Sequence, residues 1–180
     1  MKTLALLLLI TTPELSYCAA LCQNNEVVIF SCHTKTQKII SVCSSIKVSA
    51  SAGYIQYRFG NKNRIELFYP TKKVHPTDSF LYNSIVQPGS IMSHLSFQNN
   101  SYKYVIYDDI AKLPPYGQNN TEEMAGVYII KENKILNAVT CLHPGKIGMS
   151  LSRAGIEEGE KEVVIPHGDY LPGLESNLKN

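Results

Sequence analysis

Polar and apolar residues alternate through most of this chain, and the alternation predicts β-strands. The clearest case is GYIQYRFGNKNRIELFYP, residues 53–70, in which two alternating runs flank a short break rich in glycine and asparagine. A period of two is typical of strands that bury one face, and such a break between two runs indicates a β-hairpin. We expect a five-residue loop over residues 60–64. We also expect one buried face, made up of Ile55, Tyr57, Phe59, Ile65, Leu67 and Tyr69.

Charged residues of this hairpin determine its expected register. If Phe59 lies opposite Ile65, then Arg58 lies opposite Glu66 on the other face, where opposite charges attract. A loop shorter by two residues would place Arg58 against Arg64, and a slip by one residue would mix the two faces. We therefore expect an Arg58–Glu66 pair across the two strands. Alternation of this kind leaves one face buried and one face wet.

Three more hairpins follow from the same pattern, each with two alternating runs around a polar turn. They cover residues 26–45, 93–109 and 126–141, with turns near residues 34–37, at Asn99–Asn100 and near Glu132–Asn133. Residues 71–90 are less regular, because prolines and a glycine divide their apolar pieces.

The tail after Cys141 allows one short helix over residues 150–156 and a strand over residues 163–165. Seven to nine short strands joined by close turns predict a mainly β fold. We expect an antiparallel β-sandwich or small barrel built from hairpins, with at most that one short helix near the C-terminus.

The first twenty residues have the pattern of a secretory signal peptide. MKTLALLLLITTPELSYCAA carries Lys2 before a short apolar run and ends on small residues. We expect cleavage after Ala20, which leaves residues 21–180 as a single disulfide-stabilised β domain. Two alternatives stay open: a buried core helix, and a lipoprotein anchored at Cys18, although Tyr17 is bulkier than lipid-attachment sites allow. The apolar run is too short to cross a bilayer as a helix, so we expect no membrane span.

Composition and charge narrow the class of partner. Lysine and arginine number 17 and acidic residues 15, and a net charge of +2 is too small to favour nucleic acid or an anionic membrane. Tyrosines outnumber phenylalanines 11 to 5, which favours strands. Tyr102 and Tyr104 share one strand face, where tyrosines either form a ligand platform or fill the core.

Four cysteines remain after the expected cleavage: Cys22, Cys32, Cys43 and Cys141. An even number in an exported chain predicts two disulfides, and the sequence leaves all three pairings open. Any pairing of Cys141 closes a loop of roughly a hundred residues, which stabilises the fold by about 4–5 kcal/mol in the chain-entropy model. Their spacings match no zinc site, so we expect neither a metal nor another cofactor.

Several runs together resemble a family of proteins: FSC, KIISVCSS, GYIQYRFG, ELFYP and AGV, with a late single cysteine. The chain resembles a family of small, uncharacterised, exported bacterial proteins, closely over residues 26–70 and loosely over residues 102–141. YIQYRFG is the most specific motif. Because that family has no assigned activity, the resemblance implies export and β structure only. As a class, an exported, disulfide-tied, tyrosine-rich β domain is also loosely similar to the periplasmic lysozyme inhibitors, although none of their inhibitory-loop motifs occurs here.

Catalytic motifs are missing from the sequence. The chain has no G-x-S-x-G elbow and no glycine-rich phosphate loop, and its five histidines are not at metal-ligand spacing. Cys141 and His143 would form a nucleophile dyad only with a free thiol, and disulfide pairing is favoured. Asp108 and Asp109 are expected to end a strand and to point to opposite faces. They would ligate calcium only with help from a distant asparagine pair, in an order that matches no known loop.

We therefore expect an exported, non-catalytic binding or inhibitor-type protein that acts in the periplasm or outside the cell on a protein partner. Two alternatives stay open: a hydrolase with a site of scattered Asp, Glu and His, and a structural envelope protein. The expected contact surface consists of the polar loops at residues 60–64 and 113–121. Its candidate partner-binding residues are Asn61, Lys62, Asn63, Arg64, Tyr116, Asn119 and Asn120.

Overall fold

A computed structural model describes residues 20–49, 52–113 and 120–143 of the chain. These residues form two antiparallel sheets, of four and five strands, and in each sheet the strands lie side by side in sequence order. The strands are β1 (Glu26–His33), β2 (Ile39–Ser45), β3 (Ile55–Asn61), β4 (Arg64–Tyr69), β5 (Leu81–Gln87), β6 (Ser90–Asn99), β7 (Tyr102–Lys112), β8 (Thr121–Lys131) and β9 (Lys134–Thr140). A single 3-10 turn, η1 (Pro76–Asp78), is the only helical element among the described residues.

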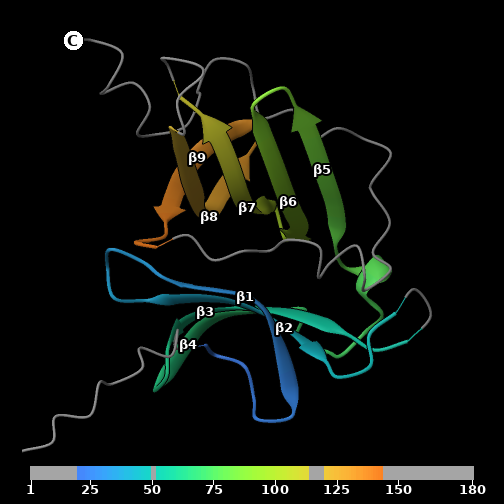
Figure 1. Cartoon of the computed structure of the whole chain (residues 1–180). Coiled ribbons are helices and arrows are strands. Elements are labelled where there is room, and N and C mark those ends of the chain that lie inside the picture. Colours follow the sequence, from blue (N-terminus) through green and yellow to red (C-terminus); the bar gives the residue numbers. More distant parts are fainter. Residues whose placement is uncertain (1–19, 50–51, 114–119, 144–180) are drawn as a thin grey trace, which may run out of the picture.

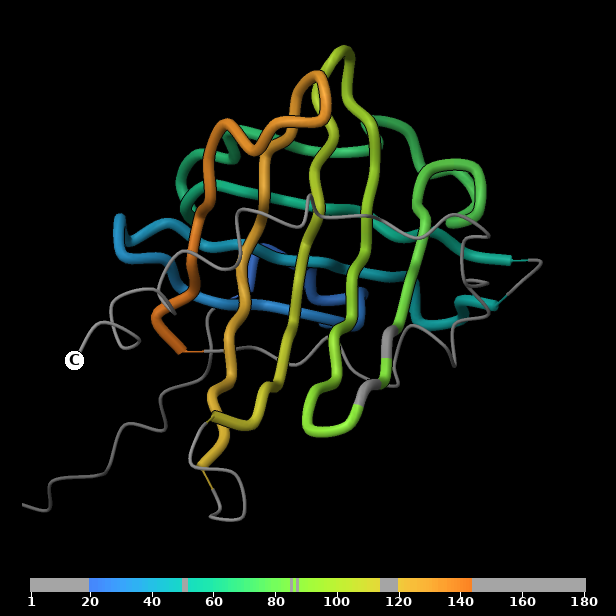
Figure 2. The backbone as a smooth tube through the Cα atoms, turned by 90° about the horizontal axis from the view of Figure 1, so that it is seen from above, coloured from blue at the N-terminus to red at the C-terminus, as the bar shows by residue number. Residues whose placement is uncertain are grey.

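The two sheets lie one over the other as two layers (Figure 1). Seen from above, the strands of the five-stranded sheet run across those of the four-stranded sheet (Figure 2). Sheets of hairpin-connected strands packed face to face in this way form a sandwich. The predicted mainly β, sandwich-like fold is therefore confirmed. The helix expected over residues 150–156 and the strand expected over residues 163–165 lie outside the described residues.

Aromatic rings fill the space between the two sheets. Phe97 of β6 stacks on Tyr104 of β7, with ring centroids 4.9 Å apart, and on Tyr69 of β4 at 4.3 Å. Tyr57 of β3 tilts against Phe97 at 5.1 Å. Each such ring pair adds about 0.5–1.5 kcal/mol beyond the area it buries. Aliphatic side chains with no solvent exposure pack with these rings in one core: Ile40, Val42, Ile55, Leu95 and Ile106.

All four predicted hairpins occur, but the register of the hairpin at residues 53–70 differs from the prediction. Asn61 pairs directly with Arg64, because its side-chain Oδ1 accepts hydrogen bonds from the backbone amides of Asn63 (3.1 Å) and Arg64 (2.9 Å). The loop is therefore two residues long rather than five. A bulge between Phe59 and Gly60 then shifts the pairing. Gly60 has a φ of 144°, and a side chain there would collide with the carbonyl of Arg64.

This register removes the predicted Arg58–Glu66 pair. Arg58 lies opposite Phe68, with its guanidinium 5.1 Å from the ring centroid, and Glu66 pairs with Lys38 instead. Ile65 was expected inside but is 45 % exposed. The other members of the predicted inner face are confirmed there, buried or packed against the core: Ile55, Tyr57, Phe59, Leu67 and Tyr69.

Two further expectations about strands were wrong. Residues 81–87 form the regular edge strand β5, which turns at Pro88–Gly89 into β6; Gly89 supplies the positive φ of 88° that this tight turn needs. The outer faces of the sheets are also not simply wet. On the four-stranded sheet Arg58 is buried, and on the five-stranded sheet Tyr107 and Tyr128 stack at 4.3 Å in a second buried cluster.

Both predicted disulfides form. They join Cys22 to Cys43 and Cys32 to Cys141. The second ties β1 to the residue that follows β9 and so connects the two sheets. Disulfides of this kind are typical of proteins that fold in an oxidising compartment outside the cytoplasm. Among the residues described, no helix has the length and apolar character needed to span a membrane.

The two disulfides allow a matched pair of stability measurements. Cys32–Cys141 spans 109 residues of sequence and Cys22–Cys43 spans 21. By loop-closure entropy, we expect the double variant C32A/C141A to lose about 4–5 kcal/mol of unfolding free energy, and C22A/C43A to lose about 3 kcal/mol. Urea titration followed by circular dichroism measures both losses. Equal losses in the two variants, or a larger loss in C22A/C43A, would contradict the entropic interpretation.

Candidate functional site

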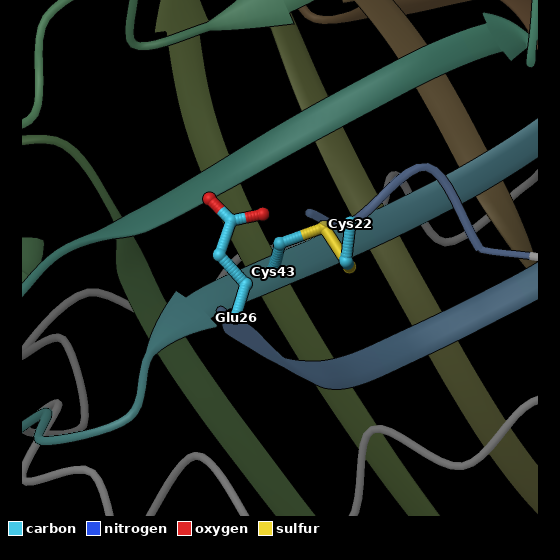
Figure 3. Close-up of side chains that lie close together, drawn as sticks. All are labelled: Cys22, Glu26 and Cys43. Atoms are coloured by element: carbon cyan, nitrogen blue, oxygen red, sulfur yellow. A yellow bond between two sulfur atoms is a disulfide. The ribbon is translucent and has the colours of Figure 1, made fainter. Parts of the chain in front are cut away.

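Cys22, Glu26 and Cys43 form the one cluster of potential metal ligands found among the described residues. Their sulfur and carboxylate oxygen atoms all lie within 4.8 Å of one another. The two sulfurs are bonded to each other beside the Glu26 side chain (Figure 3). Metals bind cysteine as the thiolate, which a disulfide cannot provide. The cluster is therefore a covalent link next to a carboxylate rather than a metal centre, consistent with the expected role of these cysteines.

The Glu26 carboxylate is held by a charged partner from the same sheet. Arg58 Nη1 lies 2.6 Å from Glu26 Oε2 and Nη2 lies 2.7 Å from Oε1, which is the two-point geometry of the strongest ion pairs. The side chain of Glu26 is 0 % exposed and that of Arg58 is 2 % exposed. Tyr54 Oη and the amide of Gln23 also donate to this carboxylate, at 3.0 and 2.7 Å. The Glu26 carboxylate therefore accepts four hydrogen bonds, all of them from groups within the protein.

The same ion pair fixes the start of the described chain to the outer face of the four-stranded sheet. Arg58 Nη1 also donates to the carbonyl of Leu21 at 2.8 Å, and the amide of Leu21 donates to Ser41 Oγ at 2.9 Å. Burial alone would raise the pKa of Glu26, but hydrogen bonds from Arg58, Gln23 and Tyr54 outweigh it, so the pKa of this carboxyl is lowered. We conclude that this cluster is a structural lock.

A second polar pair, His94 and Asp109, lies on the outer face of the five-stranded sheet. His94 Nε2 is 3.1 Å from Asp109 Oδ1, in the arrangement of a carboxylate that orients an imidazole. The two side chains are only 2 % and 3 % exposed. A general base must reach the proton that it removes, so this pair cannot act on a substrate in the described conformation. Asp108 and Asp109 do not end their strand as expected, because β7 continues to Lys112.

Among the described residues, a groove between the two sheets is the candidate surface for binding. Its volume is about 270 Å³. One wall comes from the β3–β4 hairpin and the other from β7, β8 and β9. It is lined by Tyr57, Phe59, Glu66, Leu67, Tyr104, Val127, Ile129 and Val139. These side chains are neighbours because the sheets cross, so that inner-face residues of distant strands meet at one corner of the sandwich.

Charge in the groove is confined to its rim. Lys38 Nζ lies 2.6 Å from the Glu66 carboxylate and 5.2 Å from the centroid of the Phe59 ring. Burial raises the pKa of the Tyr57 and Tyr104 hydroxyls, so both stay neutral at physiological pH. The groove therefore presents neutral aromatic and aliphatic surface with one neutralised ion pair at its edge. It is suited to hold an apolar group, and its one carboxylate, Glu66, is paired with Lys38.

Four of the predicted partner-binding residues, Asn61, Lys62, Asn63 and Arg64, lie exposed at the tip of the β3–β4 hairpin. This hairpin also supplies one wall of the groove. Asn61 has a structural role as well, because it closes the turn. Asn120 is exposed before β8, while Tyr116 and Asn119 lie outside the described residues, so the second predicted loop is not placed relative to the groove.

Sequence reasoning missed the groove, the buried Glu26–Arg58 ion pair and the buried His94–Asp109 contact. The His94–Asp109 pair was within reach of the sequence: the turn at Asn99–Asn100 sets a register in which His94 faces Tyr107, one diagonal step from Asp109. Glu26 and Arg58 lie on β1 and β3, which do not pair, so no hairpin rule connects them. Comparisons with protein-family models, curated proteins and solved structures found no match to this chain.

The lowered pKa of Glu26 predicts a loss of stability in acid. The ion pair stabilises the fold fully above the ordinary carboxyl pKa of 4.5, and this contribution disappears as the pH falls through the lowered folded-state value. We expect Glu26→Gln to cost about 3 kcal/mol of unfolding free energy at pH 7, and the difference from wild type to narrow below pH 4.5.

Urea unfolding between pH 2.5 and 7 measures this difference. Glu66→Gln is the matched control, because it breaks the exposed pair with Lys38, which is worth about 0–1 kcal/mol. If the difference in unfolding free energy between wild type and Glu26→Gln stays constant across the pH range, the ion-pair explanation is contradicted.

Proposed function

We propose that this protein is an exported, non-catalytic binding protein of the inhibitor type, acting in the periplasm or outside the cell. Its contact surface is the groove between the sheets together with the β3–β4 hairpin tip. The observation that carries this proposal is the groove itself: an open, aromatic and aliphatic concavity at the edge of an otherwise well-packed sandwich. Apolar concavities of this kind receive the side chains that dominate protein interfaces.

The chemistry of the described residues supports binding rather than catalysis. The four described cysteines are joined in two disulfides and therefore offer no free thiol. The Glu26 carboxylate is held by hydrogen bonds from within the protein, and the His94–Asp109 pair is shielded from solvent. The groove is lined by neutral side chains apart from Glu66. A hydrolase needs an accessible nucleophile or base next to its substrate, and the one carboxylate in the groove, Glu66, is already paired with Lys38.

The size of the groove favours a protein partner over a small molecule. Pockets for small-molecule ligands usually measure about 300–1,000 Å³ and enclose most of the ligand. At about 270 Å³, this groove is below that range and is open to solvent. It is large enough for one bulky apolar side chain projecting from a partner. The exposed hairpin tip beside it adds polar groups of the kind that surround such an anchor at interface rims.

Site-specific cross-linking tests this assignment. A photoreactive benzoyl-phenylalanine at Ile65, which is adjacent to Glu66 of the groove lining, lies beside the groove rim, and one at Val86 on the far edge strand β5 does not. Both positions are exposed apolar edge residues, at 45 % and 74 %. The two labelled proteins are irradiated in the cells that make them. We expect the label at position 65 to yield one adduct with a partner protein and the label at position 86 to yield none.

The variant Leu67→Gln places a polar group in the groove wall and is expected to lower the adduct yield at least tenfold, as loss of an interface hot spot does. Its circular dichroism and urea midpoint show whether the sandwich is intact. Identical adducts from positions 65 and 86, or a yield that Leu67→Gln leaves unchanged in a folded protein, would refute the groove as the contact surface.

A further inference from the structure

Charge is unevenly distributed along the strands that form one wall of the groove. At the groove end, β8 ends at Lys131 and β9 begins at Lys134, with Glu132 in the turn between them; Lys103 of β7 lies at the same end but on the outer face. At the other end, β7 and β8 carry Asp108, Asp109, Glu122 and Glu123, with Lys112 as the one base. The small net charge of the whole chain therefore hides a sheet that is basic where the groove lies and acidic where it does not.

The opposite wall of the groove repeats this bias. The β3–β4 hairpin tip carries Lys62 and Arg64. Arg64 is three residues from Leu67 of the groove lining, which is about 10 Å along a strand, and Lys131 is two residues from Ile129, about 7 Å. Both distances are comparable with the Debye length of about 8–10 Å in physiological salt. An anionic group next to an apolar anchor in the groove would therefore be attracted by the positive charges on both walls.

Two contacts describe the surroundings of the basic groups at the β8–β9 end, which form no ion pair with the residues that the structure describes. Lys131 Nζ lies 5.5 Å from the centroid of the Tyr102 ring and forms no ion pair with any described residue. Lys131 also pairs directly across the strands with Lys134. Like charges in that position repel and destabilise a hairpin. A bound anion would relieve this repulsion.

We infer that the partner contacts the groove through an acidic apolar segment: one bulky apolar side chain flanked, within two or three residues, by aspartate or glutamate. The apolar side chain enters between Tyr57, Tyr104 and Leu67. The carboxylates lie toward Lys131 and Lys134 on one wall and Arg64 on the other. This inference rests on the proposed function and specifies the chemistry of its partner.

Lys38 shows why the flanking charge is negative rather than positive. Its ammonium already occupies the cation position at the groove rim, paired with Glu66 and placed over Phe59. A basic group on the partner would have to displace this internal cation and would face repulsion from the remaining lysines. An acidic group meets no such competitor, since the one carboxylate that lines the groove, Glu66, is already paired.

Three short capped peptides test the inference with the full-length protein. The acidic peptide is acetyl-Ser-Phe-Asp-Glu-Ser-amide, the basic peptide has Lys-Lys in place of Asp-Glu, and the anchorless peptide has Ala in place of Phe. Binding is followed by the NMR shifts of the backbone amides of Ile129 and Val139. We expect the acidic peptide to bind about threefold to tenfold more tightly than the basic peptide at low salt. That difference is expected to shrink at 0.5 M salt, because the charges are screened.

Variants locate the effect. Lys131→Gln is expected to remove most of the preference for the acidic peptide. Lys112 is an exposed lysine at the acidic end of β7, so Lys112→Gln is the matched control and should leave the preference unchanged.

Equal binding of acidic and basic peptides would overturn the inference while the proposed function stands. Equal binding of the anchorless and acidic peptides would overturn it as well, because charge alone would then be recognised. If none of the three peptides shifts the groove amides, both the inference and the proposed groove function are wrong.

Discussion

The contact between two crossing sheets through a column of aromatic rings organises this protein. Phe97 lies at its centre, stacked between Tyr69 and Tyr104 and met by Tyr57 from the side. These rings come from β3, β4, β6 and β7, so the column can form only when both hairpin sheets are in place. Rings of this size also hold the layers apart. Where the crossing sheets no longer cover each other, mostly aromatic and aliphatic residues line the remaining space as an open groove rather than a closed core.

The surface features divide into those that maintain the fold and those left free for recognition. The Arg58–Glu26 pair, the Cys22–Cys43 link and the contacts of Leu21 all lie on the outer face of the four-stranded sheet, where they hold the start of the domain in place. The groove and its basic surroundings lie between the layers and use none of these groups. The proposed contact surface therefore shares no residue with this outer-face lock, whereas Tyr57 and Tyr104 belong both to the groove and to the aromatic column.

Much of this fold was predictable from alternation and turn chemistry, because both are local. Asn100 and Asn133 adopt the positive φ that asparagine tolerates, in the turns that the sequence predicts, and the strands beside them follow. The predicted register of the hairpin at residues 53–70 is wrong because it rests on an Arg58–Glu66 attraction, whereas the turn formed by the Asn61 side chain sets the pairing. The groove and the Glu26–Arg58 pair depend on how strands that do not pair meet in space. The alternation of polar and apolar residues carries no information about such contacts.

The connectivity of the disulfides has a consequence for biogenesis. Along the chain the four cysteines are interleaved: the bond from Cys22 passes over Cys32, whose own partner, Cys141, lies near the end of the last strand. In the export that we propose, the chain enters the oxidising compartment N-terminus first, and Cys32 meets both Cys22 and Cys43 before Cys141 arrives. On that route the native bonds form only if Cys32 stays a thiol until Cys141 arrives or if a premature bond is reshuffled, so maturation would depend on the thiol–disulfide exchange chemistry of the compartment.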